Sequence, residues 1–156
     1  MADTHCTLIY GGGKVGLMGV LADSVLAKNG QVIGVIPDFL LKLEVAHTAI
    51  SRLEVVSTMH DRKKRMAELS DVFVALPGGW GTRDELAEIL TWRQLGLIDK
   101  PAYILNPNGF FDHLISQMQR MTESGFLHQR NFDSLGIART VDELMPLLSL
   151  NHTHKY

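Results

Sequence analysis

Apolar and polar positions along the chain form blocks that predict an alternation of strands and helices. Short apolar runs, typical of strands, occupy residues 7–10, 31–36, 53–57, 71–76, 100–106 and 135–138. The run at 71–76 is continuous enough for a strand that is buried on both faces. Helical spacing of apolar residues predicts helices over 17–28, 59–69, 85–95, 110–124 and 141–148, whereas 39–51 reads as an irregular connection. The alternation predicts an α/β fold, a Rossmann-like open parallel sheet with helices on both faces.

Composition narrows the class of protein. A chain of 156 residues is one domain by length, and 46% hydrophobic with 21% charged residues is typical of a globular protein. The net charge of −2 gives no reason to expect nucleic acid or an anionic membrane as a partner. No apolar run approaches a membrane span, and the single Cys6 excludes an internal disulfide. We therefore expect one cytoplasmic domain over 1–156, with frayed ends at 1–7 and 150–156.

A glycine-rich turn between a strand and a helix is the strongest candidate for a functional site. Leu76-Pro77-Gly78-Gly79-Trp80-Gly81-Thr82-Arg83-Asp84-Glu85 follows the strand at 71–76. Glycines let several backbone N–H groups point one way, and the positive end of the following helix adds to an anion site. Thr82 can cap that helix or donate to an anion, and Glu85 stands three residues on, as in a capping box. The turn therefore predicts a phosphate site, unless it is only a tight strand-to-helix connection.

Two further segments carry candidate chemistry. Gly11, Gly13 and Gly16 match the dinucleotide pattern G-x-G-x-x-G, with Asp38 near the place of a ribose-binding acid. A basic run at 62–65 begins the helix after the third strand, at the sheet edge where open parallel sheets bind ligands. Such a run is usually a solvated face of a helix. However, an arginine near the start of a helix is repelled by the positive end of the helix dipole, which destabilises the helix, and a bound anionic ligand would offset this destabilisation.

Taken together, these segments resemble the LOG ("lonely guy") family. The resemblance runs from Leu8 to about Leu148, on three motifs in the family's order and spacing. They are Tyr10-Gly11-Gly12-Gly13-Lys14-Val15-Gly16-Leu17-Met18-Gly19, Met59-His60-Asp61-Arg62-Lys63 and Pro77-Gly78-Gly79-Trp80-Gly81-Thr82-Arg83-Asp84-Glu85. The family comprises cytokinin riboside 5′-monophosphate phosphoribohydrolases, once labelled lysine decarboxylases. The resemblance implies hydrolysis of the N-glycosidic bond of a nucleoside 5′-monophosphate, which releases free base and ribose 5-phosphate.

The resemblance also implies roles for particular residues. Arg62 and Glu85 would be the catalytic pair, with Glu85 stabilising an oxocarbenium-like sugar and Arg62 holding Glu85 charged. Trp80 would contact the substrate through its backbone, and Glu44 would lie near the base or ribose. The remaining residues expected to bind substrate are Gly12, Gly13, Lys63, Gly78, Gly79, Gly81, Thr82 and Thr91.

The family context adds two expectations about the whole protein. Family members are dimers or larger, and the neighbouring subunit completes each site, so we expect a homodimer or higher homo-oligomer. The family also has a strand, a Cys-Gly-Ser-Ser loop and a helix ahead of the Tyr-Gly-Gly-Gly segment, whereas seven residues precede Leu8 here. We expect the chain to lack that strand and helix. The strand is normally central, between the strands predicted at 7–10 and 53–57.

Three alternatives remain open at this stage. A non-catalytic nucleotide or cofactor carrier would share the fold and both glycine loops. A nicotinamide-dependent oxidoreductase would rest on the G-x-G-x-x-G match alone. A pyridoxal-phosphate decarboxylase needs a Schiff-base lysine, for which Lys14, Lys63 and Lys64 are the candidates. The histidines lack metal-ligand spacing, so no metal and no cofactor is expected.

Overall fold

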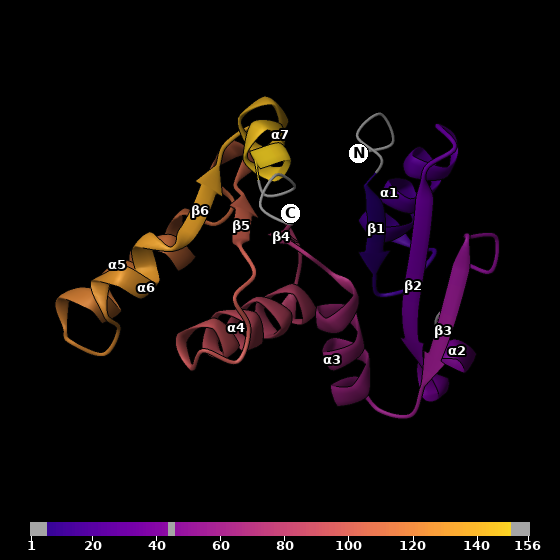
Figure 1. The fold of residues 1–156 in the computed structure, drawn as a ribbon, viewed down its shortest axis with the longest axis horizontal. Helices are drawn as coiled ribbons and strands as arrows, with labels where there is room; N and C mark the ends of the chain where they lie inside the picture. Colours follow the sequence, from indigo (N-terminus) through magenta and orange to yellow (C-terminus); the bar gives the residue numbers. More distant parts are fainter. Residues whose placement is uncertain (1–5, 44–45, 151–156) are drawn as a thin grey trace. The chain divides into compact units, whose positions relative to one another are not determined.

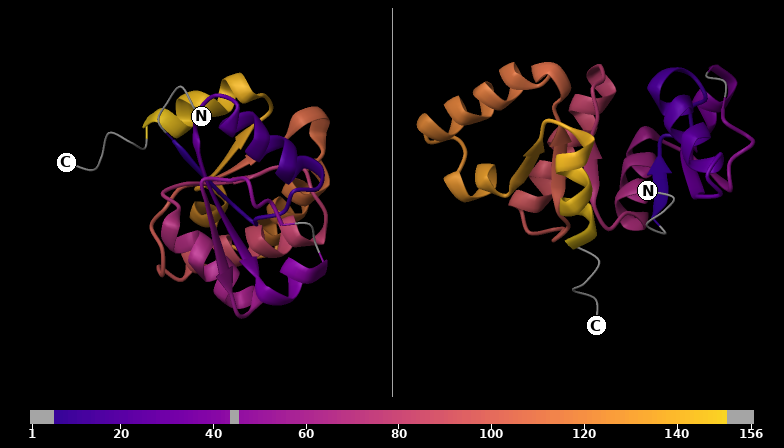
Figure 2. Two further views of the ribbon diagram at one scale, coloured as in Figure 1. Left: turned by 90° about the vertical axis from the view of Figure 1, so that its right-hand side faces the viewer. Right: turned by 90° about the horizontal axis from the view of Figure 1, so that it is seen from above.

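The computed structural model describes residues 6–43 and 46–150. The chain divides into two compact units, Met1–Ser70 and Asp71–Tyr156. Each unit carries a three-stranded parallel sheet flanked by helices (Figures 1 and 2). The predicted α/β class with parallel sheets is therefore confirmed. Within the described residues, no helix has the length and apolar character needed to span a membrane.

The first unit is built on a sheet with the strand order β1-β2-β3. Its strands are β1 (Thr7–Tyr10), β2 (Gln31–Pro37) and β3 (Arg52–Val56), and its helices are α1 (Gly16–Leu26), α2 (Asp38–Leu43) and α3 (Met59–Leu69). Thr7 pairs with Gln31 and Ile33 with Arg52, so β2 lies between β1 and β3. The predicted place for a further strand between these two is therefore wrong, because β2 itself occupies it.

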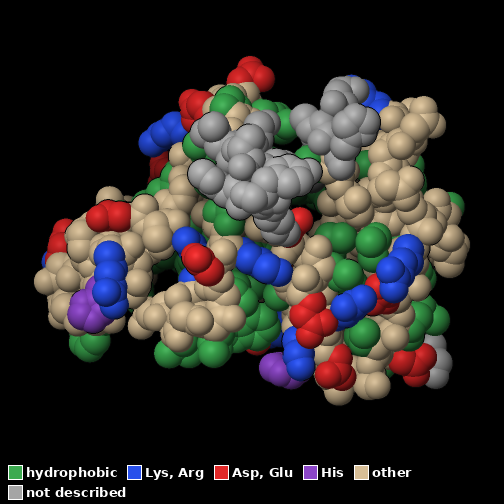
Figure 3. Space-filling model, viewed as in Figure 1, with side chains coloured by type: hydrophobic (Ala, Val, Ile, Leu, Met, Phe, Trp, Pro, Cys, Tyr) green, Lys and Arg blue, Asp and Glu red, His purple; other side chains and the backbone are tan. Residues whose placement is uncertain are grey.

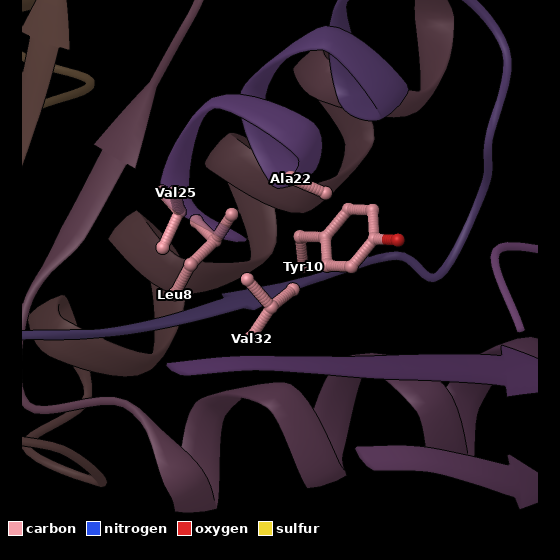
Figure 4. Close-up of a cluster of buried hydrophobic side chains, with 5 residues drawn as sticks. All are labelled: Leu8, Tyr10, Ala22, Val25 and Val32. Carbon is pink, nitrogen blue, oxygen red and sulfur yellow. The ribbon is translucent and has the colours of Figure 1, made fainter. Parts of the chain in front are cut away.

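The core of the first unit lies between α1 and the sheet. Figure 4 shows the side chains that form it, which are Leu8, Tyr10, Ala22, Val25 and Val32. Alternate residues of β1 point to this side, as a strand period of two requires, and α1 supplies residues three apart. Asn29 takes a positive φ of 57° after α1, and the Gly30 N–H donates to the Val25 carbonyl at 2.9 Å. This confirms Asn29-Gly30 as the signal that ends the helix.

The Tyr10 hydroxyl makes this core sensitive to alkali. It is buried and has no hydrogen-bond partner within the described part of the chain. Burial, together with the nearby Asp23 carboxylate, raises the pKa of Tyr10 from 10.0 to about 12. The folded state therefore favours the neutral phenol. The free energy of unfolding that depends on this neutral form is fully present below pH 10 and is lost as the pH rises toward 12.

We predict that Tyr10→Phe removes this alkaline loss. At pH 7 the variant should be as stable as the wild type or more stable by about 1 kcal/mol, because a buried polar group without a partner disappears. Urea unfolding between neutral pH and pH 12 measures both effects. Tyr103→Phe is the control, because the Tyr103 hydroxyl donates to the Leu147 carbonyl at 3.4 Å. A Tyr10→Phe variant that is less stable at pH 7, with an unchanged alkaline profile, would contradict the prediction.

The second unit has the strand order β4-β5-β6. Its strands are β4 (Phe73–Ala75), β5 (Ala102–Leu105) and β6 (Leu135–Ala138). Its helices are α4 (Trp80–Gln94), the 3₁₀ turn η2 (Pro107–Gly109), α5 (Asp112–Glu123), α6 (Gln129–Asp133) and α7 (Val141–Leu150). Ala138, Leu144 and Leu148 form a core where α7 packs on β6.

Several predicted boundaries differ from the structure. β4 is a three-residue edge strand of half-buried residues, so the prediction of a strand buried on both faces over 71–76 is wrong. α2 lies where an irregular connection was predicted, and α6 was not predicted at all. Thr7, the first residue of β1, pairs with Gln31 of β2, and α7 extends to Leu150. Each of these residues lies at the inner edge of a segment that was predicted to fray. Most of both predicted frayed ends lies outside the described residues. No observation of the structure tests whether the whole chain forms one domain, which stays a prediction.

Candidate functional site

The glycine-rich turn after β4 leads directly into α4. The helix begins at Trp80 with Gly79 as its N-cap, and no side chain caps it within the described chain. Thr82 is therefore the third residue of the helix, and the predicted capping box of Thr82 and Glu85 is wrong. Two glycines flanking Trp80 weaken the sequence signal for a helix, since glycine is a poor helix former. The start was consequently predicted five residues too late.

This arrangement leaves the start of α4 suited to an anion. In the first turn of a helix, no carbonyl of the helix lies four residues earlier to accept a hydrogen bond. The backbone N–H groups of Trp80, Gly81 and Thr82 therefore have no acceptor within α4. The first turn carries no acidic residue, whereas the first turns of α3, α5 and α7 each carry at least one. The positive end of a 15-residue helix is thus not compensated by its own first turn.

The structural reason for a glycine differs among the three glycine positions of the turn. A Cβ on Gly78 would collide with the Oγ1 atom of Thr82, so packing explains that glycine. Around Gly79 and Gly81, apart from the adjacent residues and the backbone of the helix itself, no described atom lies within 4 Å of the place a Cβ would take. Neither glycine has a positive φ. Packing therefore does not explain either glycine, and the open space beside both lets a ligand approach the backbone.

Side chains of α4 divide between two faces of the helix. The Trp80 side chain is 85% exposed, with the Arg83 guanidinium 5.9 Å from its ring centroid, and its predicted backbone contact with substrate stays a prediction. Glu85 is half-buried one turn into the helix, on the face that also carries Glu88 and Trp92. Thr91 lies on the other face, where it lines a cavity that Glu85 does not line. The structure thus does not bring Thr91 to Glu85.

In the first unit, Arg62 turns inward from the basic run. It is 9% exposed, and its Nε–H donates to the Val35 carbonyl at 3.2 Å. The guanidinium lies against Gly11, the residue that follows β1, so closely that a Cβ there would collide with Nη2. Arg62 is thereby fixed beside the carboxyl end of β1, an edge at which parallel sheets bind ligands.

The other charges of the basic run are placed differently. The Arg65 Nε–H donates to Glu54 Oε2 at 2.7 Å, and Nη1 donates to Glu68 Oε2 at 3.2 Å. The hydrogen bond from Arg65 lowers the pKa of Glu54, and the charge of Arg52 acts in the same direction. On the face shown in Figure 3, basic and acidic side chains are interspersed. The basic run is therefore not one anion-binding patch, and Arg62 is its distinctive member. Lys63 beside it is half-buried.

The first glycine segment is engaged by its own chain. The His47 N–H donates to the Gly12 carbonyl at 2.9 Å, and Gly13 forms an isolated bridge with Ala46. His47 is buried, and its Nε2 atom lies 2.8 Å from Asp23 Oδ1, which ties this segment to α1. Gly12 and Gly13 therefore help to hold the segment at 46–47 in place. Their predicted contact with substrate stays a prediction. Glu44 lies outside the described residues.

The predicted site residues are divided between the two units. Gly78, Gly79, Gly81, Thr82 and Glu85 belong to the second unit, and Arg62 and Lys63 to the first. Sequence reasoning missed Gly11 and the Val35 carbonyl as the groups that hold Arg62, and it missed the cavity along α4. Among the described residues, no group of three or more His, Cys, Asp or Glu side chains could hold a metal ion.

Comparisons with known proteins identify the family. The family model described as "Possible lysine decarboxylase" matches residues 18–149. The cytokinin riboside 5′-monophosphate phosphoribohydrolase LOG1 of Arabidopsis thaliana is 45% identical over 127 residues, which cover 81% of this chain and 60% of that protein. The cytokinin riboside 5′-monophosphate phosphoribohydrolase of Rhodococcoides fascians is 46% identical over 128 residues, 81% of this chain and 65% of that protein.

A solved structure shares the fold. The molybdenum cofactor binding protein from the phototrophic bacterium Rippkaea orientalis superposes with a TM-score of 0.71 at 23% identity, covering 97% of this chain and 81% of that one. At this identity the likeness shows the fold alone. The chain spans about three fifths of the length of the curated relatives named above. With the family model matching most of its residues and relatives more than 40% identical, the chain belongs to the LOG family.

Proposed function

We propose that this chain hydrolyses the N-glycosidic bond of a purine or cytokinin nucleoside 5′-monophosphate to free base and ribose 5-phosphate. The main support for this proposal is that the chain is 45–46% identical to relatives named for that activity. The open glycine turn at the start of α4 supports it, because amides and a helix N-terminus suit a 5′-phosphate. AMP and cytokinin riboside 5′-monophosphates are the substrates we expect.

The proposed chemistry gives a role to the predicted residues of each unit. Cleavage leaves the bonding electron pair on the base nitrogen, which takes up a proton, while positive charge develops at C1′ of the ribose. Glu85 stabilises that charge and orients the water whose oxygen bonds to C1′. Arg62 keeps Glu85 ionised and orients ribose or phosphate through its planar fork. The amides of 79–82 hold the phosphate, which anchors the substrate by a group remote from the reacting bond.

The remaining predicted residues belong to the same proposal. Lys63 adds positive charge for the phosphate, and the Thr82 hydroxyl can donate to it. Gly12, Gly13 and Glu44 are proposed contacts to the rest of the nucleotide, whereas Thr91 lies on the other face of α4 from Glu85 and is left out of this proposal. We further propose that the protein acts as a cytoplasmic homodimer or higher homo-oligomer whose subunits share active sites.

Product analysis tests the proposal. The full chain is incubated with AMP, a cytokinin riboside 5′-monophosphate or adenosine, and chromatography follows the free base and ribose 5-phosphate. We expect equal amounts of both products from the nucleotides. Adenosine should react far more slowly, because it lacks the phosphate that anchors the substrate. Bound AMP that stays intact would overturn hydrolysis and favour a carrier.

A further inference from the structure

The second unit contains a cavity that the proposed reaction does not use. It has a volume of about 470 Å³, and its lining residues come from α4 on one side and from α5, α6 and the start of β6 on the other. This volume falls within the range of pockets that hold small organic molecules. All of its lining residues lie between Arg83 and Leu135, within one unit.

The cavity and Glu85 lie on opposite sides of α4. The lining residues of the helix include Arg83, Ala87, Leu90, Thr91 and Gln94, which recur at the spacing of a single helical face. At 3.6 residues per turn, Glu85 is rotated from Thr91 by roughly 120° and from Gln94 by roughly 180° about the helix axis. A nucleotide whose ribose faces Glu85 would therefore leave this cavity empty.

The floor of the cavity is apolar and adaptable. Leu86, Met118 and Leu135 are 6–8% exposed and close its base, while the half-buried Leu90, Met121 and Phe132 line its walls. Methionine side chains are unbranched and adapt to ligands of different shape. Such a lining suits an aromatic or branched aliphatic body.

The polar part of the lining is strongly cationic. Arg83 and Arg93 come from α4 and Arg130 from α6, against the single carboxylate of Asp99. The Arg93 Nη1–H donates to the Ser134 carbonyl at 3.0 Å, which fixes this guanidinium between α4 and the start of β6. A guanidinium has five N–H donors, so that hydrogen bond leaves several for a ligand. The cavity is thus lined by three arginines from two helices and by one carboxylate, and this excess of positive charge favours an anionic ligand.

We propose that this cavity is a second ligand site, which binds an organic carboxylate with an aromatic or branched aliphatic body. The apolar floor takes the body, and the arginines bind the carboxylate through their planar forks. The site is separate from the nucleotide site, so its ligand is neither substrate nor product of the proposed hydrolysis.

Calorimetric titration with 2-naphthoate tests the proposal, with 2-naphthalenemethanol as the uncharged probe of the same body. We expect saturable one-site binding of naphthoate and weaker binding of the alcohol. Arg130→Glu should weaken naphthoate binding by about tenfold or more and leave the alcohol nearly unchanged, because it removes one charged contact. The matched control is Arg120→Glu, which changes an exposed arginine of α5 that does not line the cavity. Glu85→Gln should bind naphthoate like the wild type, which separates this proposal from the proposed hydrolysis.

A second pair of variants tests the apolar part of the lining. Leu90→Gln should weaken both probes, whereas Leu95→Gln should weaken neither, because Leu95 is 64% exposed and does not line the cavity. The proposal is overturned if naphthoate does not saturate by about 1 mM, or if Arg130→Glu and Arg120→Glu behave alike. It is also overturned if Leu90→Gln dissociates a dimer that naphthoate does not perturb, since a second copy of the chain would then occupy the cavity.

Discussion

Replacing Glu85 with glutamine should lower kcat/KM for base release from AMP by about 10²- to 10⁴-fold, the usual contribution of a positioned acid–base group. Glutamine keeps the size and hydrogen-bonding capacity of the side chain but cannot carry the negative charge that opposes the developing oxocarbenium ion. Because phosphate binding does not involve Glu85, affinity for the product ribose 5-phosphate should change little. Free base is measured by chromatography and ribose 5-phosphate binding by calorimetry.

The matched control for this variant is Glu88→Gln. Glu88 is also half-buried and lies three residues further along the same face of α4. Its replacement removes an equal charge from the same helix, so it reports any general electrostatic effect. Equal losses in the two variants, or no loss in Glu85→Gln, would remove Glu85 from the catalytic role.

The second large effect is expected at Gly11. A Cβ at this position would occupy the space of the Arg62 guanidinium, which is buried and hydrogen-bonded to the Val35 carbonyl. Gly11→Ala should therefore displace the guanidinium and destabilise the fold by about 1–3 kcal/mol, as overpacking commonly does. Base release should fall by about 10²-fold, since a shift of about 1 Å in a positioning group can have that effect. Urea unfolding and the base-release assay measure the two losses.

The Arg62→Ala background shows whether the clash is with this side chain. There the alanine at position 11 has no guanidinium to displace, so Gly11→Ala should cost almost no further stability. An equal cost in both backgrounds would mean that Gly11 is required for another reason, such as its own backbone. Measuring the two single variants and the double variant gives this coupling directly.

Much of the fold could be predicted because most of its elements follow a simple period. β6 matches its predicted bounds, α1 and α3 match theirs closely, and each has apolar residues at strand or helix spacing. α2 could not be predicted in this way. Of its four apolar residues, Phe39, Leu41 and Leu43 are exposed and Leu40 is half-buried, so no fully buried apolar side chain marks one face of the helix. With six residues it is also too short to show two turns of a pattern.

The candidate site was predictable in its parts and less so in its arrangement. Arg62 stands at helical spacing from Met59 and Met66, two of the apolar residues of α3, and this spacing could have singled it out from its basic neighbours. The face of α4 that carries Thr91 could likewise have been separated from that of Glu85 by counting residues. By contrast, the contact of Arg62 with Gly11 joins residues 51 positions apart. Residue spacing alone does not reveal such a contact.

The central claim is that Arg62 and Glu85 act on the same glycosidic bond. A double-mutant cycle on kcat/KM for AMP, with Arg62→Gln, Glu85→Gln and the double variant, tests it most directly. If both groups stabilise one transition state, removing the second should cost little once the first is gone, because groups that act as a unit are not additive. We therefore predict that the double variant is as slow as the slower single variant, within about threefold. Losses that multiply in the double variant would show that the two residues act independently and would contradict the claim.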